Sequence, residues 1–102
     1  MCEKPGHPRA LPAPSTRLTA VGTDLLAAAC DASRASPRRR MILPLHKGPG
    51  DALQRMLNVV QPGSYIRPHR HAADRGEGLI VLSGKLLYLA FDDAGEVGQA
   101  LV

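Results

Sequence analysis

The sequence predicts a mainly β domain that begins with one helix. Short apolar segments recur from about residue 41 to the end of the chain, and turns rich in glycine, proline and aspartate separate them. An alanine-rich stretch with helical periodicity precedes the first of these segments. Short strands at regular spacing favour a sandwich or barrel, and 102 residues suffice for a single domain with a modest core.

Before the helix, residues 1–16 are expected to form a flexible, proline-rich tail, which leaves residues 17–102 for the folded domain. The helix is predicted over about residues 19–35, with Thr19 or Thr23 as its N-cap. Its apolar stripe is expected to consist of Val21, Leu25, Leu26, Ala29 and Cys30.

Strands are expected from about residue 39, after Pro37 has ended the helix. The predicted strands cover residues 41–46, 53–61, 65–71, 79–83, 85–91 and 97–102. Pro44 places the first strand at a sheet edge, because proline cannot donate to a ladder. Gly84 is expected to join two strands in a tight hairpin, and Asp92–Gly95 is expected to form the next turn.

Composition limits the function classes. The formal net charge is +4, but the arginines are scattered and no aromatic residues are interleaved with them, which argues against nucleic-acid binding. The spacing of Cys2 and Cys30 fits neither a metal site nor a disulfide framework. Leu26–Cys30 superficially resembles a lipoprotein cleavage site, yet Asp24 interrupts the apolar segment that export requires. No membrane segment is expected, and a reduced, cytoplasmic location is predicted.

Two histidines and a carboxylate form the main candidate site. Alternate side chains of an extended strand share a face, so His69 and His71 are expected to point the same way, about 7 Å apart. If the strand that follows Glu77 pairs back antiparallel, this carboxylate lies near both imidazoles. Such a set offers three ligands to a divalent transition metal (Fe, Mn, Ni, Co, Cu or Zn) and leaves positions open. The alternative is a pair of solvent-facing histidines.

These residues resemble the first signature motif of the cupins, small β-barrels that hold a metal inside. The motif runs through Gly63, His69, His71, Glu77 and Gly84. Further blocks are similar to the WbuC-type cupin-fold metalloproteins: Ser36-Pro-Arg-Arg-Arg40, Asp51-Ala-Leu-Gln54-Arg-Met-Leu-Asn58, Pro62-Gly-Ser-Tyr-Ile-Arg-Pro-His-Arg-His71 and Phe91-Asp-Asp-Ala-Gly95. The resemblance covers about residues 19–102. It implies a cupin-type jelly-roll barrel with a metal, in a bacterial family often associated with surface-polysaccharide genes, and it implies no particular reaction.

The chain departs from the cupin pattern in two places. Five residues separate His71 from Glu77, where three or four are usual, so the loop of residues 72–76 is expected to bulge. The sequence ends at Val102, before the second cupin motif, whose histidine completes the metal site in that family. The barrel could therefore be incomplete. His46 is the candidate fourth ligand, and the alternative is a histidine on the outside of its strand.

Three more residues are candidates for binding a substrate. Arg67 shares the strand parity of the two histidines and could hold a carboxylate or phosphate in a bidentate contact. The alternative is an arginine at the rim or on the surface, and this alternative is stronger for Arg55. Tyr65 could donate a hydrogen bond to a ligand or could fill the core.

The residues are compatible with several functions. The chain could be a metal-dependent isomerase, epimerase or oxygenase that acts on a small sugar-like or anionic substrate in polysaccharide metabolism. No separate general base is evident, so no catalytic residue is assigned. The chain could instead be a non-catalytic module that binds a small ligand or uses the metal structurally. A shortened barrel would expose unpaired edges, which favours a homodimer.

Overall fold

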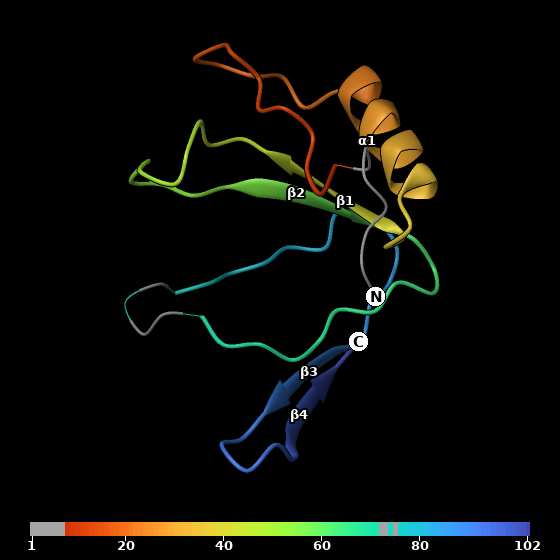
Figure 1. Ribbon diagram of the computed structural model, residues 1–102, viewed down its shortest axis with the longest axis vertical. Coiled ribbons are helices and arrows are strands. Elements are labelled where there is room, and N and C mark those ends of the chain that lie inside the picture. Colours follow the sequence, from red (N-terminus) through yellow and green to blue (C-terminus); the bar gives the residue numbers. More distant parts are fainter. Residues whose placement is uncertain (1–7, 72–73, 75) are drawn as a thin grey trace. The chain divides into compact units, whose positions relative to one another are not determined.

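The computed structural model describes residues 8–71, 74 and 76–102. The elements in these residues are helix α1 (Thr23–Ala35) and strands β1 (Arg40–Pro44), β2 (Met56–Val60), β3 (Tyr88–Phe91) and β4 (Val97–Leu101) (Figure 1). β1 pairs with β2 and β3 pairs with β4, each pair antiparallel. The chain divides into two compact units, Met1–Tyr65 and Ile66–Val102, and each unit holds one of these sheets. A helix followed by short strands is thus confirmed.

α1 begins at Thr23, later than the predicted start. Its N-cap residue is Gly22, which has no side chain that could cap the helix. Asp24 lies in the first turn, where a negative charge interacts favourably with the helix dipole. Ser36 is extended, as the residue before a proline should be, and Pro37 ends the helix as predicted. Within the part of the chain described, no helix has the length and apolar character needed to cross a bilayer.

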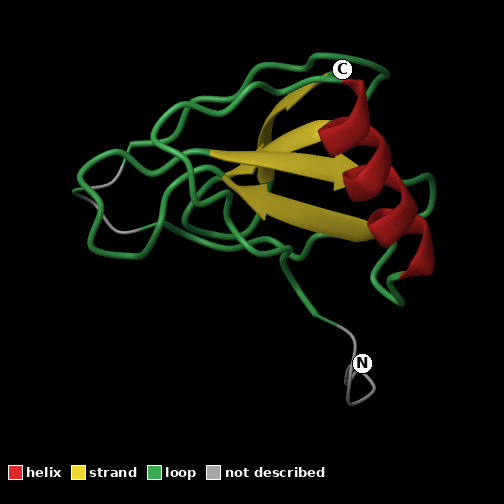
Figure 2. Cartoon of the chain, turned by 90° about the horizontal axis from the view of Figure 1, so that it is seen from above, coloured by secondary structure: helices red, strands yellow, loops and turns green. Residues whose placement is uncertain are grey.

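The core of the first unit lies where α1 packs against β1 and β2 (Figure 1 and Figure 2). Met41 and Leu43 are 2% and 1% exposed and alternate along β1 with less buried residues. Ala29 of α1 is fully buried. This alternation is typical of a strand with one covered face. The first unit is therefore stabilised mainly by burial of aliphatic side chains between a helix and a two-stranded sheet.

Polar side chains add a second link between α1 and the sheet. Ser33 is buried; its Oγ donates to the Cys30 carbonyl oxygen (2.6 Å) and accepts from Gln61 Nε2 (2.8 Å). These bonds matter because a buried hydroxyl group without partners would be destabilising. The predicted apolar stripe was wrong in part: Ser33 is buried, whereas Leu26 is 37% exposed.

The connection from α1 to β1 contains a strained residue. The Arg39 N–H donates to the Ser36 carbonyl oxygen (3.0 Å) across a turn in which Pro37 takes its favoured position. Arg39 has a φ of 59°, in the left-handed region, which costs a residue other than glycine about 1–2 kcal/mol. The Gln61 N–H donates to the Arg39 carbonyl oxygen (2.8 Å) and continues the β1–β2 ladder up to this turn.

Part of the segment predicted as a tail lies along β1. The Leu11 N–H donates to the Ile42 carbonyl oxygen (2.8 Å), and Ala10 forms an isolated parallel bridge with Ile42. Further along, Lys47 Nζ donates to the Ser15 carbonyl oxygen (2.9 Å). The edge of β1 that faces away from β2 is therefore covered at Ile42. Residues 1–7, which include Cys2, lie outside the described part of the chain.

The second unit holds the β3–β4 hairpin and long loops. The turn predicted at Asp92–Gly95 is confirmed. Asp92 Oδ1 accepts hydrogen bonds from the backbone N–H groups of Ala94 and Glu96, each at 2.9 Å. Gly95 has a φ of 83°, a conformation that glycine adopts without strain. Local side-chain chemistry therefore accounts for this turn, as it does for many turns that contain aspartate.

Two predicted strands are absent from the described residues. Residues 65–71 and 79–83 form no ladder, and the hairpin expected around Gly84 does not form, because β3 pairs with β4. Pro68 removes a ladder donor from the first of these segments. In the second, Leu79 to Leu82 stay at least 47% exposed, so no covered apolar face stabilises a strand. The described residues accordingly form two small sheets and no closed barrel.

Candidate metal centre

The segment that carries the histidines follows a tight turn. Across Gln61–Ser64 the last N–H donates to the first carbonyl oxygen (3.1 Å), and Gly63 has a φ of 85°. Proline followed by glycine with positive φ is the pattern of a type II turn. Pro68 then favours extended backbone at Arg67. The local sequence thus favours extended backbone just before the two histidines.

The two histidine rings lie next to each other in the second unit. The ring centroids of His69 and His71 are 4.9 Å apart, and the ring planes meet at 77°. His69 Nδ1 is 2.8 Å from the Arg67 carbonyl oxygen. When Nδ1 carries the ring proton it donates to this carbonyl, which leaves the Nε2 lone pair available. Histidines that bind metals are commonly oriented in this way.

The carboxylate predicted as third ligand contacts the second histidine. His71 Nε2 lies 2.6 Å from Glu77 Oε2, and both side chains are nearly half exposed. Water screens a pair at this exposure, so the contact adds little to stability. What it does is bring an imidazole nitrogen and a carboxylate oxygen together. The loop expected to bulge between them, 72–76, contains residues 72, 73 and 75, which lie outside the described part of the chain.

The three side chains meet as two neighbouring pairs, His69 with His71 and His71 with Glu77. Across the described residues, no group of three histidine, cysteine, aspartate or glutamate side chains converges into a preformed metal site. The donor atoms are nevertheless two imidazole nitrogens and one carboxylate oxygen, the types that divalent transition metals prefer. The residues therefore fit such a metal in donor type, and closing the site requires movement of exposed side chains.

His46 lies in the first unit, just after β1. Its Nδ1 is 3.1 Å from the Arg55 amide nitrogen and 2.7 Å from the Arg55 carbonyl oxygen. The neutral Nε2–H form accepts from that N–H, whereas a protonated Nδ1 donates to that carbonyl. The Leu45 N–H also donates to the Arg55 carbonyl oxygen (2.9 Å). The His46 side chain thus adds to the backbone hydrogen bonding between the chain after β1 and the chain before β2. A role as fourth ligand stays a prediction.

The predicted substrate-binding residues lie on the surface. Tyr65 is 72% exposed and does not fill the core; its carbonyl oxygen accepts from Arg40 Nη1 (3.1 Å). Arg67 and Arg55 are exposed, and each contacts a histidine ring through its backbone. Binding of a substrate by their guanidinium groups stays a prediction.

One polar contact near the histidines was not predicted from the sequence. Arg70 Nη1 donates to Asp93 Oδ1 at 2.9 Å, and both side chains are exposed. The pair joins the histidine segment to the β3–β4 turn within the second unit. Both residues lie in the blocks that resemble the cupins, but an ion pair between positions so distant in sequence depends on tertiary placement.

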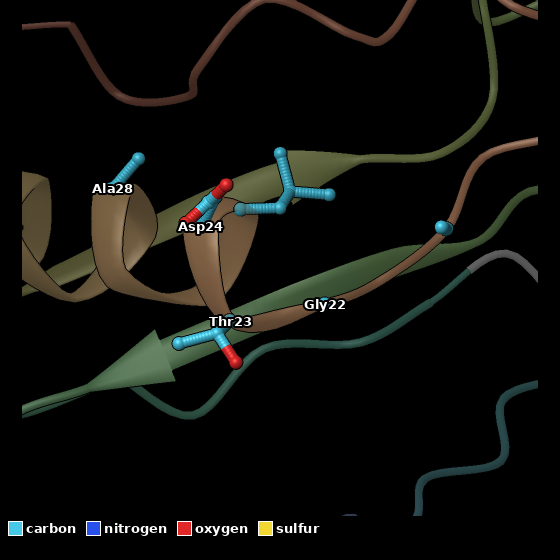
Figure 3. A pocket seen from close by; sticks show the side chains of 6 residues that line it. Gly22, Thr23, Asp24 and Ala28 are labelled. Carbon is cyan, nitrogen blue, oxygen red and sulfur yellow. The ribbon is translucent and has the colours of Figure 1, made fainter.

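Shallow hollows also occur in the first unit. One lies at the start of α1, where Figure 3 shows Thr23, Asp24 and Ala28 in its lining. Its lining has one ionisable group, Asp24, which the helix dipole already accounts for. Another hollow is lined in part by His46 and Gln54. Neither hollow includes a predicted ligand of the second unit.

A family model described as a domain of unknown function, DUF6016, matches residues 21–102. This span covers most of the chain. The chain belongs to the DUF6016 family. No curated protein and no solved structure matches it. The DUF6016 span begins just before α1 and contains all three predicted metal ligands, whereas the segment that lies along β1 precedes it.

Proposed function

We propose that this DUF6016 chain binds a divalent transition metal through His69, His71 and Glu77. The observation that carries the proposal is the 2.6 Å contact between His71 Nε2 and Glu77 Oε2, with the His69 ring centroid 4.9 Å from that of His71. Two neutral imidazoles and one carboxylate match Fe, Mn, Ni, Co, Cu or Zn better than Ca or Mg. The resemblance to WbuC-type cupins supports the same assignment and a jelly-roll fold.

The activity we infer is that of a metal-dependent enzyme of the isomerase, epimerase or oxygenase type, in the cytoplasm of a bacterium. The metal supplies Lewis-acid polarisation of a carbonyl or hydroxyl group when it is bound. Arg67, exposed and two residues before His69, is suited to hold a carboxylate or phosphate of a small sugar-like substrate from polysaccharide metabolism. Arg55 and Tyr65 are secondary candidates for contacts with this substrate.

A non-catalytic module, built as a homodimer, is the second candidate. It is favoured by the low burial in the second unit, where every described residue except Ala90 is exposed and even Leu86 and Leu89 are each 39% exposed. A two-stranded hairpin without a covered face is marginally stable. A structural metal or a second copy of the chain would supply the missing stability.

Elemental analysis of untagged protein tests the proposal. We expect a stoichiometric transition metal in the unaltered chain and a large loss in the His69→Ala, His71→Ala double variant. His7→Ala is a matched control, because it removes a histidine from the N-terminal segment and should keep the metal. Equal metal content in the unaltered chain and the double variant would show that the proposed ligands are wrong.

Removing the metal separates the two candidates. A structural metal should leave a chain with a lower melting temperature, whereas a catalytic metal should leave the fold intact and abolish turnover. Chelation followed by thermal denaturation measures the first effect. Sedimentation of the same samples tests the homodimer, and a monomer at all concentrations would exclude it.

A further inference from the structure

One ion pair joins the proposed metal centre to the β3–β4 hairpin. Arg70 stands between the two histidines, and its Nη1 donates to Asp93 Oδ1 at 2.9 Å. Asp93 belongs to the turn Asp92–Gly95 that connects β3 with β4. We propose that this ion pair couples metal binding to the ordering of the hairpin, an inference that rests on the metal-binding function proposed above.

The histidine segment would contact both the metal and the hairpin. Arg70 lies between His69 and His71 in the sequence, and its guanidinium contacts Asp93. The two histidine rings lie next to each other, with centroids 4.9 Å apart. A metal held by the histidines and the hairpin held by Arg70 would therefore restrain the same short stretch of backbone. Restraint of this stretch by one of them lowers the entropic cost of binding the other.

The turn that carries Asp93 is held by its own hydrogen bonds. Asp92 Oδ1 accepts two backbone N–H groups, the Gly95 N–H donates to the Asp92 carbonyl oxygen (3.0 Å), and the Asp92 N–H donates to Glu96 (2.8 Å). These bonds hold the backbone on both sides of Asp93. Its carboxylate is thus presented to Arg70 from an ordered turn rather than from a loose loop, which lowers the entropic cost of the contact.

The hairpin has no fully buried side chain to stabilise it. β3 and β4 have little covered apolar surface: Tyr88, Phe91 and Val97 are all at least 41% exposed. A hairpin of this kind is marginally stable, so even a weak contact changes its population measurably. An exposed ion pair is worth a shift of about two- to five-fold in an equilibrium constant. The coupling we expect is therefore small and within reach of hydrogen exchange.

Hydrogen exchange of the full, untagged chain with and without Zn²⁺ tests the coupling. In the unaltered chain Zn²⁺ should slow amide exchange both near the histidines and in the hairpin, the latter about two- to five-fold. In Asp93→Ala and in Arg70→Ala, Zn²⁺ should still slow amide exchange near the histidines but should no longer slow it in the hairpin. Both variants should bind Zn²⁺ about two- to five-fold more weakly. The double variant Arg70→Asp, Asp93→Arg should recover both effects.

Asp31→Ala is the matched control, because it removes the exposed ion pair with Arg34 (3.2 Å) in α1 and should change neither readout. Zn²⁺ binding with equal hairpin protection in Asp93→Ala would overturn the coupling and leave the metal site standing. No binding of Zn²⁺ by the unaltered chain would overturn the metal-binding function itself, and the coupling with it.

Discussion

The two units of the chain bury their side chains to very different extents. In Met1–Tyr65, residues Ala29, Met41 and Leu43 are at most 2% exposed, whereas in Ile66–Val102 no described side chain is fully buried. The first unit is stabilised by burial between a helix and a sheet. The second depends on one ladder, turn hydrogen bonds and contacts between exposed polar groups. The candidate site thus lies in the unit with the smaller reserve of stability, as ligand-binding loops often do.

The largest expected effect comes from the core of the first unit. Leu43→Ala should cost about 2–5 kcal/mol of unfolding free energy, because Leu43 is 1% exposed and its removal leaves a cavity. Urea denaturation followed by the circular dichroism of α1 measures this loss. Leu87→Ala is the matched change in the second unit, where Leu87 is 61% exposed, and should stay within about 0.5 kcal/mol. Equal losses in the two variants would remove the contrast between the units.

The difference in burial between the units also explains which of their elements the sequence predicts. Pro37 and the turn Asp92–Gly95 behave as predicted because their effects depend on local backbone chemistry. β1 and β2 are also found near their predicted places, where α1 covers one face of the sheet. The strands predicted at 65–71 and 79–83 fail because an apolar pattern stabilises a strand only where something covers it.

Around the candidate site, one predicted contact is found, and other features were not predicted. Glu77 was predicted to approach the histidines through antiparallel strand pairing; that pairing is absent, yet Glu77 contacts His71 directly. The left-handed Arg39 and the ion pair between Arg70 and Asp93 were not predicted. Neither leaves a signal in the sequence, because one depends on how a turn meets a sheet and the other on tertiary placement.

A second difference between the units concerns positive φ. Among the described residues of the second unit, positive φ occurs only at glycines, Gly84 and Gly95. In the first unit it occurs at Gly63 and at Arg39, and at Arg39 it costs strain. Arg39→Gly should therefore raise the stability of the first unit by about 1 kcal/mol. The helix signal in urea measures the gain. Arg39→Ala is the control, because it removes the charge and keeps the strain. A similar gain in both variants would point to charge rather than to backbone conformation.

The smallest expected effect on stability comes from His46 in the first unit, which we expect to be structural, in contrast to the metal-binding histidines of the second unit. His46 contacts the Arg55 backbone, so His46→Ala should cost about 0.5–1 kcal/mol of the first unit's stability and leave the metal content unchanged. His46→Asn should keep part of this stability, because the amide oxygen can accept the Arg55 N–H. His69→Ala should do the reverse, lowering the metal content without changing the unfolding of the metal-free chain. Metal loss in His46→Ala would instead make His46 a ligand, and the separation between a structural histidine and metal-binding histidines would fail.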